Sequence, residues 1–249
     1  MTGLLPWPER TGRIVLEEVD STMSEAARLA PELKQPTWIM ALHQSAARGR
    51  RGRSWEMPKG NFAASYVFRP AGTASEAALR SFSAAVALFE ALALSVERDR
   101  LSLKWPNDVL LDGGKVAGIL LESVGTQNQI DWLAIGFGVN LASVPEGVRD
   151  ASFPPVSLEG AGAGPLDLDE LLSRLAQNMA TEEGIFAELG FAPIREKWLR
   201  HAARLGEVIT ARTARDEVTG VFETVDPFGQ LVLRTPDGQV SIPAADVYF

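Results

Sequence analysis

A loop rich in arginine and glycine, set between two apolar runs, is the feature that most restricts how this chain can fold. Residues 47–53 read Ala-Arg-Gly-Arg-Arg-Gly-Arg, and apolar residues dominate positions 37–42 before them and 62–68 after them. This order predicts two strands joined by a strongly basic loop. Glycine lets backbone N–H groups approach a ligand, and guanidinium groups match the oxygens of carboxylates and phosphates. The loop therefore predicts a site for a multiply charged anion; the alternative is a basic surface loop that touches nucleic acid or no ligand.

Composition narrows the classes of chemistry. The chain has 249 residues, 46% of them apolar, a net charge of −8, two histidines and no cysteine. This length allows one large domain, or a large domain with a small one. The lack of cysteine excludes thiolate nucleophiles, iron–sulfur clusters and cysteine-bound zinc, and the acidic balance argues against a broad nucleic-acid-binding face. His43 and His201 belong to no spaced motif, so we expect both to be structural.

The N-terminus and the hydropathy predict a cytoplasmic protein. Residues 1–8 lack a basic start and a sustained apolar stretch, so we expect no signal peptide. No apolar run has the length that crosses a bilayer. Together with the lack of cysteine, these features favour the cytoplasm and no membrane association.

The first part of the chain predicts a sheet with two helices. Asp20, Ser21 and Thr22 precede a helix that should reach Ala30, with Thr22 and Glu25 as a capping box. A long buried helix is predicted over residues 74–96, and Asp-Gly-Gly at residues 112–114 predicts a tight hairpin. The strands are predicted at residues 14–19, 38–42, 62–68, 101–111, 115–123 and 130–140.

The residues after position 143 differ in composition and in the length of the predicted elements. Residues 144–164 are rich in proline, glycine and alanine and predict a surface excursion, and two helices are expected at residues 168–189 and 193–202. After Gly206, short alternating strands are separated by turns at residues 226–229 and 236–238. This pattern predicts a small β-barrel attached to the main domain.

A second polar segment follows the long helix. Residues 104–108 read Lys-Trp-Pro-Asn-Asp, and residues 115–122 read Lys-Val-Ala-Gly-Ile-Leu-Leu-Glu. Because proline removes a ladder donor, Pro106 could bend its strand and turn the two residues after it toward a cavity. Lys115 taken alone is better explained as the solvated lysine of an ordinary hairpin. The triplet at residues 113–115 is not a P-loop, since the upstream glycine and the following Ser or Thr are missing, so ATP would need another scaffold.

Four segments in serial order resemble the motifs of the biotin–protein ligases, the enzymes that biotinylate the carrier domain of biotin-dependent carboxylases. They are the loop at residues 48–53 with Trp55, the segment at residues 104–108, the segment at residues 115–122, and Gly-Phe-Gly-Val-Asn at residues 136–140. The resemblance runs from about Asp20 to the C-terminus and so covers nearly the whole chain.

The resemblance implies an α+β fold, with a mixed sheet backed by helices over residues 1–204 and a small SH3-like barrel over residues 205–249. It implies an enzyme that converts biotin and ATP to biotinyl-5′-AMP, releases pyrophosphate, and then biotinylates a lysine of a biotin carboxyl carrier domain. Magnesium would accompany ATP. The expected partners are biotin, ATP and the carrier domain, without DNA or membrane, and the sequence leaves a monomer or a homodimer open.

The resemblance also assigns roles to the residues that match the family's motifs. The polar side chains that would hydrogen-bond the biotin head group are Ser21, Thr22 and Gln44. The loop residues that would meet the biotin carboxylate and the nucleotide phosphates are Arg48, Gly49 and Arg50. Lys115 would bridge the carboxylate and the α-phosphate. The glycines that would make room along the biotin pocket are Gly118, Gly136 and Gly138, while Trp55 and Asn107 would lie near the nucleotide.

The implied chemistry suits a chain without an evident catalytic histidine or cysteine. A carboxylate is already ionised at neutral pH, so its attack on the α-phosphorus needs no general base. Arg48, Arg50 and Lys115 would position the reactants and stabilise charge on the phosphoryl oxygens. In the second step the attacking amine must lose a proton, and we expect Asp108 to orient this amine or to accept its proton.

Three departures from the family's pattern accompany the resemblance. Ala47 stands where glycine is common, and Met23 stands where asparagine usually follows the Ser-Thr pair. About a dozen residues precede the first predicted strand, too few for the helix-turn-helix of many members, so we expect the ligase-only form.

Two other functions remain open from sequence. A lipoate–protein ligase also adenylates a carboxylate and acylates a lysine, although the Arg/Gly loop and residues 104–108 favour biotin. The related octanoyltransferases rely on a cysteine and are excluded. A non-enzymatic module that binds RNA or another anion through residues 48–53 is the second alternative, and the net acidity counts against it.

Overall fold

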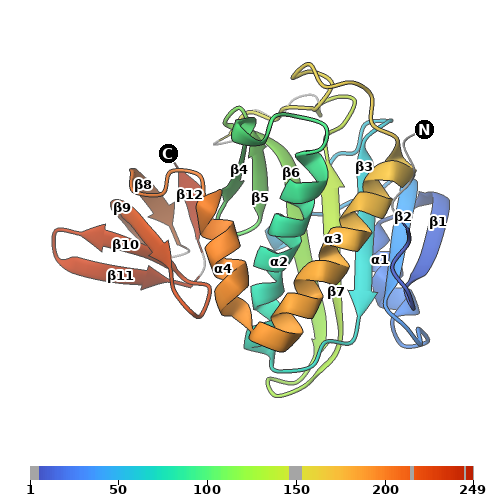
Figure 1. Ribbon diagram of the computed structural model, residues 1–249, viewed down its shortest axis with the longest axis horizontal. Helices are drawn as coiled ribbons and strands as arrows, with labels where there is room; N and C mark the ends of the chain where they lie inside the picture. The colour runs from blue at the N-terminus through green and yellow to red at the C-terminus, as the bar shows by residue number, and fades with distance from the viewer. Residues whose placement is uncertain (1–5, 146–152, 214–215, 244, 249) are drawn as a thin grey trace.

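A mixed sheet organises the larger part of the chain (Figure 1). The computed structural model describes residues 6–145, 153–213, 216–243 and 245–248. The sheet has the order β1-β2-β3-β7-β6-β5-β4, in which β1 and β2 are parallel and all other neighbours are antiparallel. Its strands are β1 (Gly12–Val19), β2 (Thr37–Gln44), β3 (Phe62–Phe68), β4 (Leu101–Lys104), β5 (Asp108–Leu111), β6 (Gly114–Gly125) and β7 (Ile130–Val139). The expected mixed sheet is confirmed.

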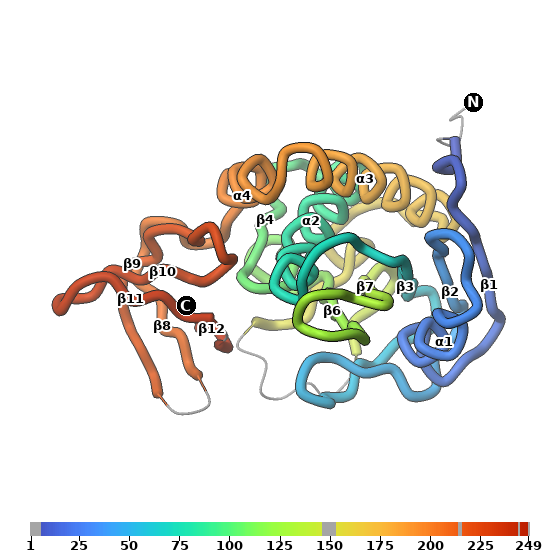
Figure 2. The backbone as a smooth tube through the Cα atoms, turned by 90° about the horizontal axis from the view of Figure 1, so that it is seen from below, coloured from blue at the N-terminus to red at the C-terminus, as the bar shows by residue number. Residues whose placement is uncertain are grey.

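Helices cover both faces of this sheet. α2 (Ala74–Leu92), α3 (Leu168–Leu189) and α4 (Phe191–Arg200) lie on the side of the large core, and α1 (Thr22–Leu29) packs against β2, β3 and β7 on the other side. Figure 2 shows this separation, with α1 and the blue segment after β2 opposite α2, α3 and α4. No helix in the described part of the chain is long and apolar enough to cross a membrane.

Alternation along the central strands decides which residues build the core. In β7, Ile135 and Phe137 belong to the large core, whereas Ala134 belongs to the smaller core beside α1. Successive side chains of a strand point to opposite faces. Gly136 and Gly138 therefore face the α1 side, where the absence of side chains leaves space above the sheet.

The start of α1 differs from the prediction. Ser21 is the N-cap, and its hydroxyl accepts a hydrogen bond from the N–H of Met23 at 3.2 Å. Glu25 pairs with Arg28 instead of reaching back to the cap. The predicted capping box is therefore wrong, because the helix is capped one residue earlier. The long helix α2 is confirmed but ends at Leu92, before the predicted end.

The region around Pro106 also corrects the sequence analysis. The predicted single strand over residues 101–111 is two antiparallel strands, β4 and β5, in which Lys104 is paired with Asp108. The Trp105–Pro106 peptide bond between them is cis. Proline cannot donate to a ladder, so the chain turns at this point instead of bending within one strand. The turn leaves Asn107 and Asp108 at the start of β5.

The expected excursion at residues 144–164 lies partly outside the described residues. Where it is described, the chain is packed beside the sheet. The N–H of Val156 donates to the carbonyl of Lys115 at 3.0 Å, and the N–H of Leu158 donates to the carbonyl of Asn140 at 3.0 Å. Leu158 is buried. Residues 153–158 of this excursion are therefore held against the sheet by backbone hydrogen bonds.

The C-terminal strands form a second, antiparallel sheet. They are β8 (Val208–Arg212), β9 (Glu217–Val225), β10 (Leu231–Thr235), β11 (Gly238–Ile242) and β12 (Asp246–Tyr248), in the order β11-β10-β9-β8-β12. The predicted turns join β9 to β10 and β10 to β11, as expected. Among the described residues, no pairing between β11 and β12 closes this sheet into a barrel.

The second sheet is docked on the first through a buried tryptophan. The indole Nε1 of Trp105 donates to the carbonyl of Gly229, in the β9–β10 turn, at 3.0 Å. Gly229 has a φ of 78°, and a Cβ there would lie 2.7 Å from Leu79 of α2. The β9–β10 turn thus rests on both α2 and the turn that carries Asn107.

One of the two histidines has the surroundings expected of a structural residue. His201 stacks on Phe89 with 4.1 Å between ring centroids, and burial lowers the pKa of its imidazole. His43 is exposed on β2. Neither lines the cavity described below.

The large core can be tested at α2. Leu88 is fully buried there. Leu88→Ala should lower the free energy of unfolding by about 2–5 kcal/mol, because it removes buried apolar surface and leaves a cavity. Leu189→Ala, at the end of α3 where the side chain is 66% exposed, should change it by less than about 0.5 kcal/mol. Urea unfolding followed by circular dichroism measures both, and equal losses would contradict this core.

Candidate active site

A cavity of about 650 Å³ lies on the α1 side of the sheet, a volume typical of small-molecule sites. Its lining joins segments that are far apart in the sequence: the start of α1, the loop after β2, the β4–β5 turn, β6, β7 and β12. All of the predicted site residues line it: Ser21, Thr22, Gln44, Arg48, Gly49, Arg50, Trp55, Asn107, Asp108, Lys115, Gly118, Gly136 and Gly138. The cavity is therefore the place where the predicted residues meet.

Buried polar groups form one part of the lining, which we call the polar end: Ser21, Thr22 and Gln44. The N–H of Thr22 donates to Gln44 Oε1 at 2.7 Å, and the hydroxyl of Ser65 donates to Thr22 Oγ1 at 2.8 Å. The Gln44 amide also lies 3.5 Å from Met57 Sδ. These contacts hold the start of α1 against the end of β2, so the polar groups are fixed before any ligand arrives.

Three glycines in the cavity lining let Met23 and Trp55 lie close to the sheet. A Cβ on Gly136 would lie 2.7 Å from Met23 Sδ, and one on Gly138 would lie 2.7 Å from Trp55 Nε1. A Cβ on Gly118 would lie 3.2 Å from the Trp55 ring. A side chain at Gly136 or Gly138 would therefore collide with Met23 or Trp55, whereas one at Gly118 would require a small shift of the Trp55 ring.

Beyond the glycines, one carboxylate faces two ammonium groups. Lys115 Nζ lies 2.7 Å from Asp108 Oδ1, and Lys104 Nζ lies 3.5 Å from Asp108 Oδ2. Burial raises the pKa of Asp108, but the two nearby lysines lower it by a larger amount. The pKa of this carboxyl is therefore below its usual range. Burial lowers the pKa of Lys104, whose ammonium lies 4.5 Å from the centre of the Phe153 ring.

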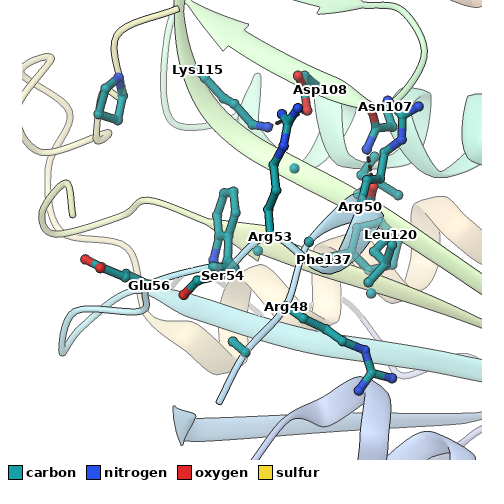
Figure 3. Close-up of a pocket in the computed structure, with 18 of the residues that line it drawn as sticks. Arg48, Arg50, Arg53, Ser54, Glu56, Asn107, Asp108, Lys115, Leu120 and Phe137 are labelled. Carbon is teal, nitrogen blue, oxygen red and sulfur yellow. Dashed lines mark hydrogen bonds and ion pairs between the residues drawn. The ribbon is translucent and has the colours of Figure 1, made fainter. Parts of the chain in front are cut away.

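The Arg/Gly loop reaches the same region from the other side. Its ends are held together by backbone hydrogen bonds, from Gly49 to Arg53 at 2.7 Å and from Trp55 to Ala47 at 3.0 Å. Arg50 Nη1 donates to Asn107 Oδ1 at 3.2 Å, and burial lowers the pKa of this guanidinium. Figure 3 shows Arg50 beside Asn107, and Lys115 beside Asp108, around one cavity. Cations from the loop and from β6 thus converge.

Arg48 differs from its expected orientation. Its guanidinium donates to both carboxylate oxygens of Glu122, at 3.1 and 2.8 Å, and to the hydroxyl of Ser24 at 2.9 Å. In Figure 3 it points away from Lys115 and Asp108. The hydrogen bonds to Glu122 raise the pKa of Arg48. In this structure the Arg48 guanidinium is therefore paired with Glu122 of β6 and does not point to the place expected for the anion.

The second sheet lines one side of the cavity. Residues 245–248 belong to the lining. Asp246 Oδ2 accepts hydrogen bonds from Arg51 at 2.8 Å and from Arg53 at 3.1 Å. Two of the loop's arginines are thus tied to β12.

Several functional candidates were missed from sequence alone. Lys104 stood within the segment that was singled out, four places before Asp108, and that proximity was the available signal. Phe153 and Asp246 reach the site only through the tertiary fold, and no local pattern marks them. Glu122, the last residue of the segment at residues 115–122, pairs with Arg48.

Comparison with known proteins agrees with this geometry. The sequence profile described as the biotin/lipoate A/B protein ligase family matches residues 15–140, and the profile of the biotin protein ligase C-terminal domain matches residues 205–249. The two profiles together include the Arg/Gly loop, the β4–β5 turn, β6, β7 and the second sheet.

Two relatives match over nearly the whole of this chain. The chain is 50% identical over 238 residues to the biotin–[acetyl-CoA-carboxylase] ligase of Paracoccus denitrificans, covering 94% of this chain and 99% of that protein. It is 29% identical to the bifunctional ligase/repressor BirA of Escherichia coli, covering 93% of this chain and 74% of that protein.

Among solved structures, the biotin protein ligase of Aquifex aeolicus in complex with biotin and ATP superposes with a TM-score of 0.80 at 26% identity. The match covers 95% of this chain and 98% of that one. With the matched family profile, the Paracoccus relative and this superposition in agreement, the chain belongs to the biotin/lipoate A/B protein ligase family.

Proposed function

We propose that this protein is a biotin–protein ligase. It activates biotin with ATP to biotinyl-5′-AMP, releases pyrophosphate, and transfers biotin to a lysine of the carrier domain of a biotin-dependent carboxylase. The observation that carries the proposal is the convergence of Arg50 and Lys115 on one cavity that also holds the polar end. The biotin ligase of Paracoccus and the biotin- and ATP-bound structure from Aquifex support it.

The order of groups across the cavity suggests how the substrates lie. The polar end offers hydroxyl and amide groups, which suit the ureido ring of biotin. From there the acyl chain would pass Gly136 and Gly138 toward Lys115. The nucleotide would lie beyond, near Arg50 and Asn107. This direction brings the biotin carboxylate to the most cationic part of the cavity.

The first step needs charge stabilisation more than proton transfer. A carboxylate oxygen of biotin attacks the α-phosphorus, a new P–O bond forms, and the bond to pyrophosphate breaks. Both reactants are anions, and unit charges about 4 Å apart interact by about 4 kcal/mol at an effective dielectric constant of ~20. Lys115 and Arg50, between the two reactants, would offset this repulsion and stabilise the phosphoryl oxygens.

Asp108 is better suited to orienting than to accepting a proton. Its lowered pKa makes it a weak base while both lysines face it. We therefore propose that Asp108 orients the attacking amine in the second step. The carrier lysine would reach the acyl-adenylate from the open side of the cavity.

Magnesium is proposed to enter with the nucleotide. Within the described residues, no group of three or more histidine, aspartate or glutamate side chains could hold a metal ion. The two carboxylates nearest the cationic groups, Asp108 and Asp246, each face two cations. We therefore treat the ion as part of the ATP substrate.

We also propose a two-domain division, with a catalytic domain over residues 1–204 and an SH3-like barrel over residues 205–249. The separate antiparallel sheet and the C-terminal domain profile support this boundary. The lining by residues 245–248 suggests that the C-terminal domain covers the nucleotide.

A cytoplasmic location suits a chain without cysteine. A homodimer is a further proposal, and size-exclusion chromatography with light scattering tests it.

One assay tests the function. Pyrophosphate release from ATP is measured with biotin, with lipoate, and with neither acid. Release that depends on biotin supports the proposal. Release that depends on lipoate would identify a lipoate ligase of the same family, and no release with either acid would leave an anion-binding module.

Lys115→Ala tests the cationic site. Its removal should lower the rate of biotinyl-adenylate formation by at least about 100-fold, because the ammonium group that joins the carboxylate and the α-phosphate is lost. The rate is normalised to the number of folded biotin sites, because the buried carboxylate of Asp108 loses one of its two ammonium partners. Lys34→Ala, at an exposed position outside the cavity, is the control and should retain the wild-type rate. Near-normal turnover of the Lys115 variant would show that this role is wrong.

Gly138→Val tests the path of the acyl chain. The added side chain would meet the Trp55 indole and narrow the cavity, so the KM for biotin should rise by at least about tenfold. Gly164→Val is the matched control, since a Cβ there has no neighbour within 4 Å. Steady-state kinetics at saturating ATP gives both values. An unchanged KM in the Gly138 variant would place the acyl chain elsewhere.

A further inference from the structure

The two lysines that face Asp108 are held in different ways. Lys104 is the ladder partner of Asp108 across β4 and β5, so the backbone fixes their separation. Its side chain is 9% exposed and its ammonium lies against the Phe153 ring. The side chain of Lys115 is 31% exposed and reaches Asp108 from β6. Lys115 can therefore move within the cavity, whereas Lys104 cannot leave without disrupting buried packing.

This asymmetry matters because the carboxylate itself is buried. The Asp108 side chain is 11% exposed. A buried charge that loses its partner is strongly destabilising. If Lys115 were the only cation beside Asp108, turning its ammonium toward a substrate would leave such a charge behind. Lys115 would then be held by Asp108 and would be unavailable for chemistry.

The neighbouring cations do not replace Lys104. Arg50 donates to Asn107, and Arg51 and Arg53 both donate to Asp246. Arg48 is paired with Glu122. Among the described residues, the cations within ion-pair distance of Asp108 are Lys104 and Lys115.

We propose that Lys104 is a positioning residue for adenylate formation: it stays as the fixed counter-charge of Asp108 and so releases Lys115 to the reacting carboxylate and phosphate. Lys104 itself touches neither substrate in this scheme. The inference rests on the proposed function, since it assigns a role within the first step of that reaction.

The test compares adenylate formation in single turnover, normalised to the number of biotin sites found by isothermal titration calorimetry. Lys104→Met should lower this rate by at least about 30-fold while changing the Kd for biotin by less than about threefold, because Asp108 retains Lys115. The double variant Lys104→Met/Asp108→Asn should regain at least about tenfold of that loss, because the carboxylate charge that retains Lys115 is gone. Lys104→Arg keeps the positive charge and should stay within about fivefold of the wild-type rate.

Lys197→Met is the matched control for the loss of a buried ion pair. Lys197 Nζ lies 2.8 Å from Glu182, whose side chain is 6% exposed, and neither residue lines the cavity. This variant should lose stability but keep the rate per biotin site. A similar rate loss in this control would show that a weakened fold, and not the counter-charge, slows the reaction.

Three results would overturn the role of Lys104: a wild-type rate in Lys104→Met, a double variant as slow as Lys104→Met, or equal losses in the Met and Arg variants. If the Met variant does not fold, the Arg variant and the double variant still decide the question. A wild-type protein that releases no pyrophosphate with biotin would instead refute the proposed function, before any variant is compared.

Discussion

The buried carboxylate of Asp108 holds the centre of the site together. It joins β5 to β4 through Lys104 and to β6 through Lys115, so three strands meet at one charge. A protein with a net charge of −8 thereby keeps a local excess of cations where two anionic substrates are expected. Isolated charges are costly to bury, and this cluster persists because each charge has a partner.

Because successive side chains of a strand point to opposite faces, the two faces of the sheet have different roles. On β7, large apolar side chains point to the helices and build the core, while the glycines between them leave room for the cavity. The same strand therefore contributes to stability on one side and to ligand space on the other. Loss of packing beneath the sheet is expected to distort the cavity above it, since the two share a backbone.

The sequence predicted the regular elements well because they depend on local patterns. The apolar runs on both sides of the Arg/Gly loop became β2 and β3, and the alanine-rich segment became α2. Recognition of the motifs placed all of the predicted site residues in one cavity. What local patterns could not predict are pairings over long separations, such as Arg48 with Glu122 and Arg51 with Asp246. The turn at Pro106 was missed because a proline in an apolar run is compatible with either a bend or a reversal.

The hydrogen bond between Trp105 and Gly229 couples the position of the second sheet to that of the first. Trp105 is buried and precedes Pro106, so its indole cannot shift far without moving the turn that carries Asn107. A shift of the β9–β10 turn would therefore displace the turn that carries Asn107, which lines the cavity.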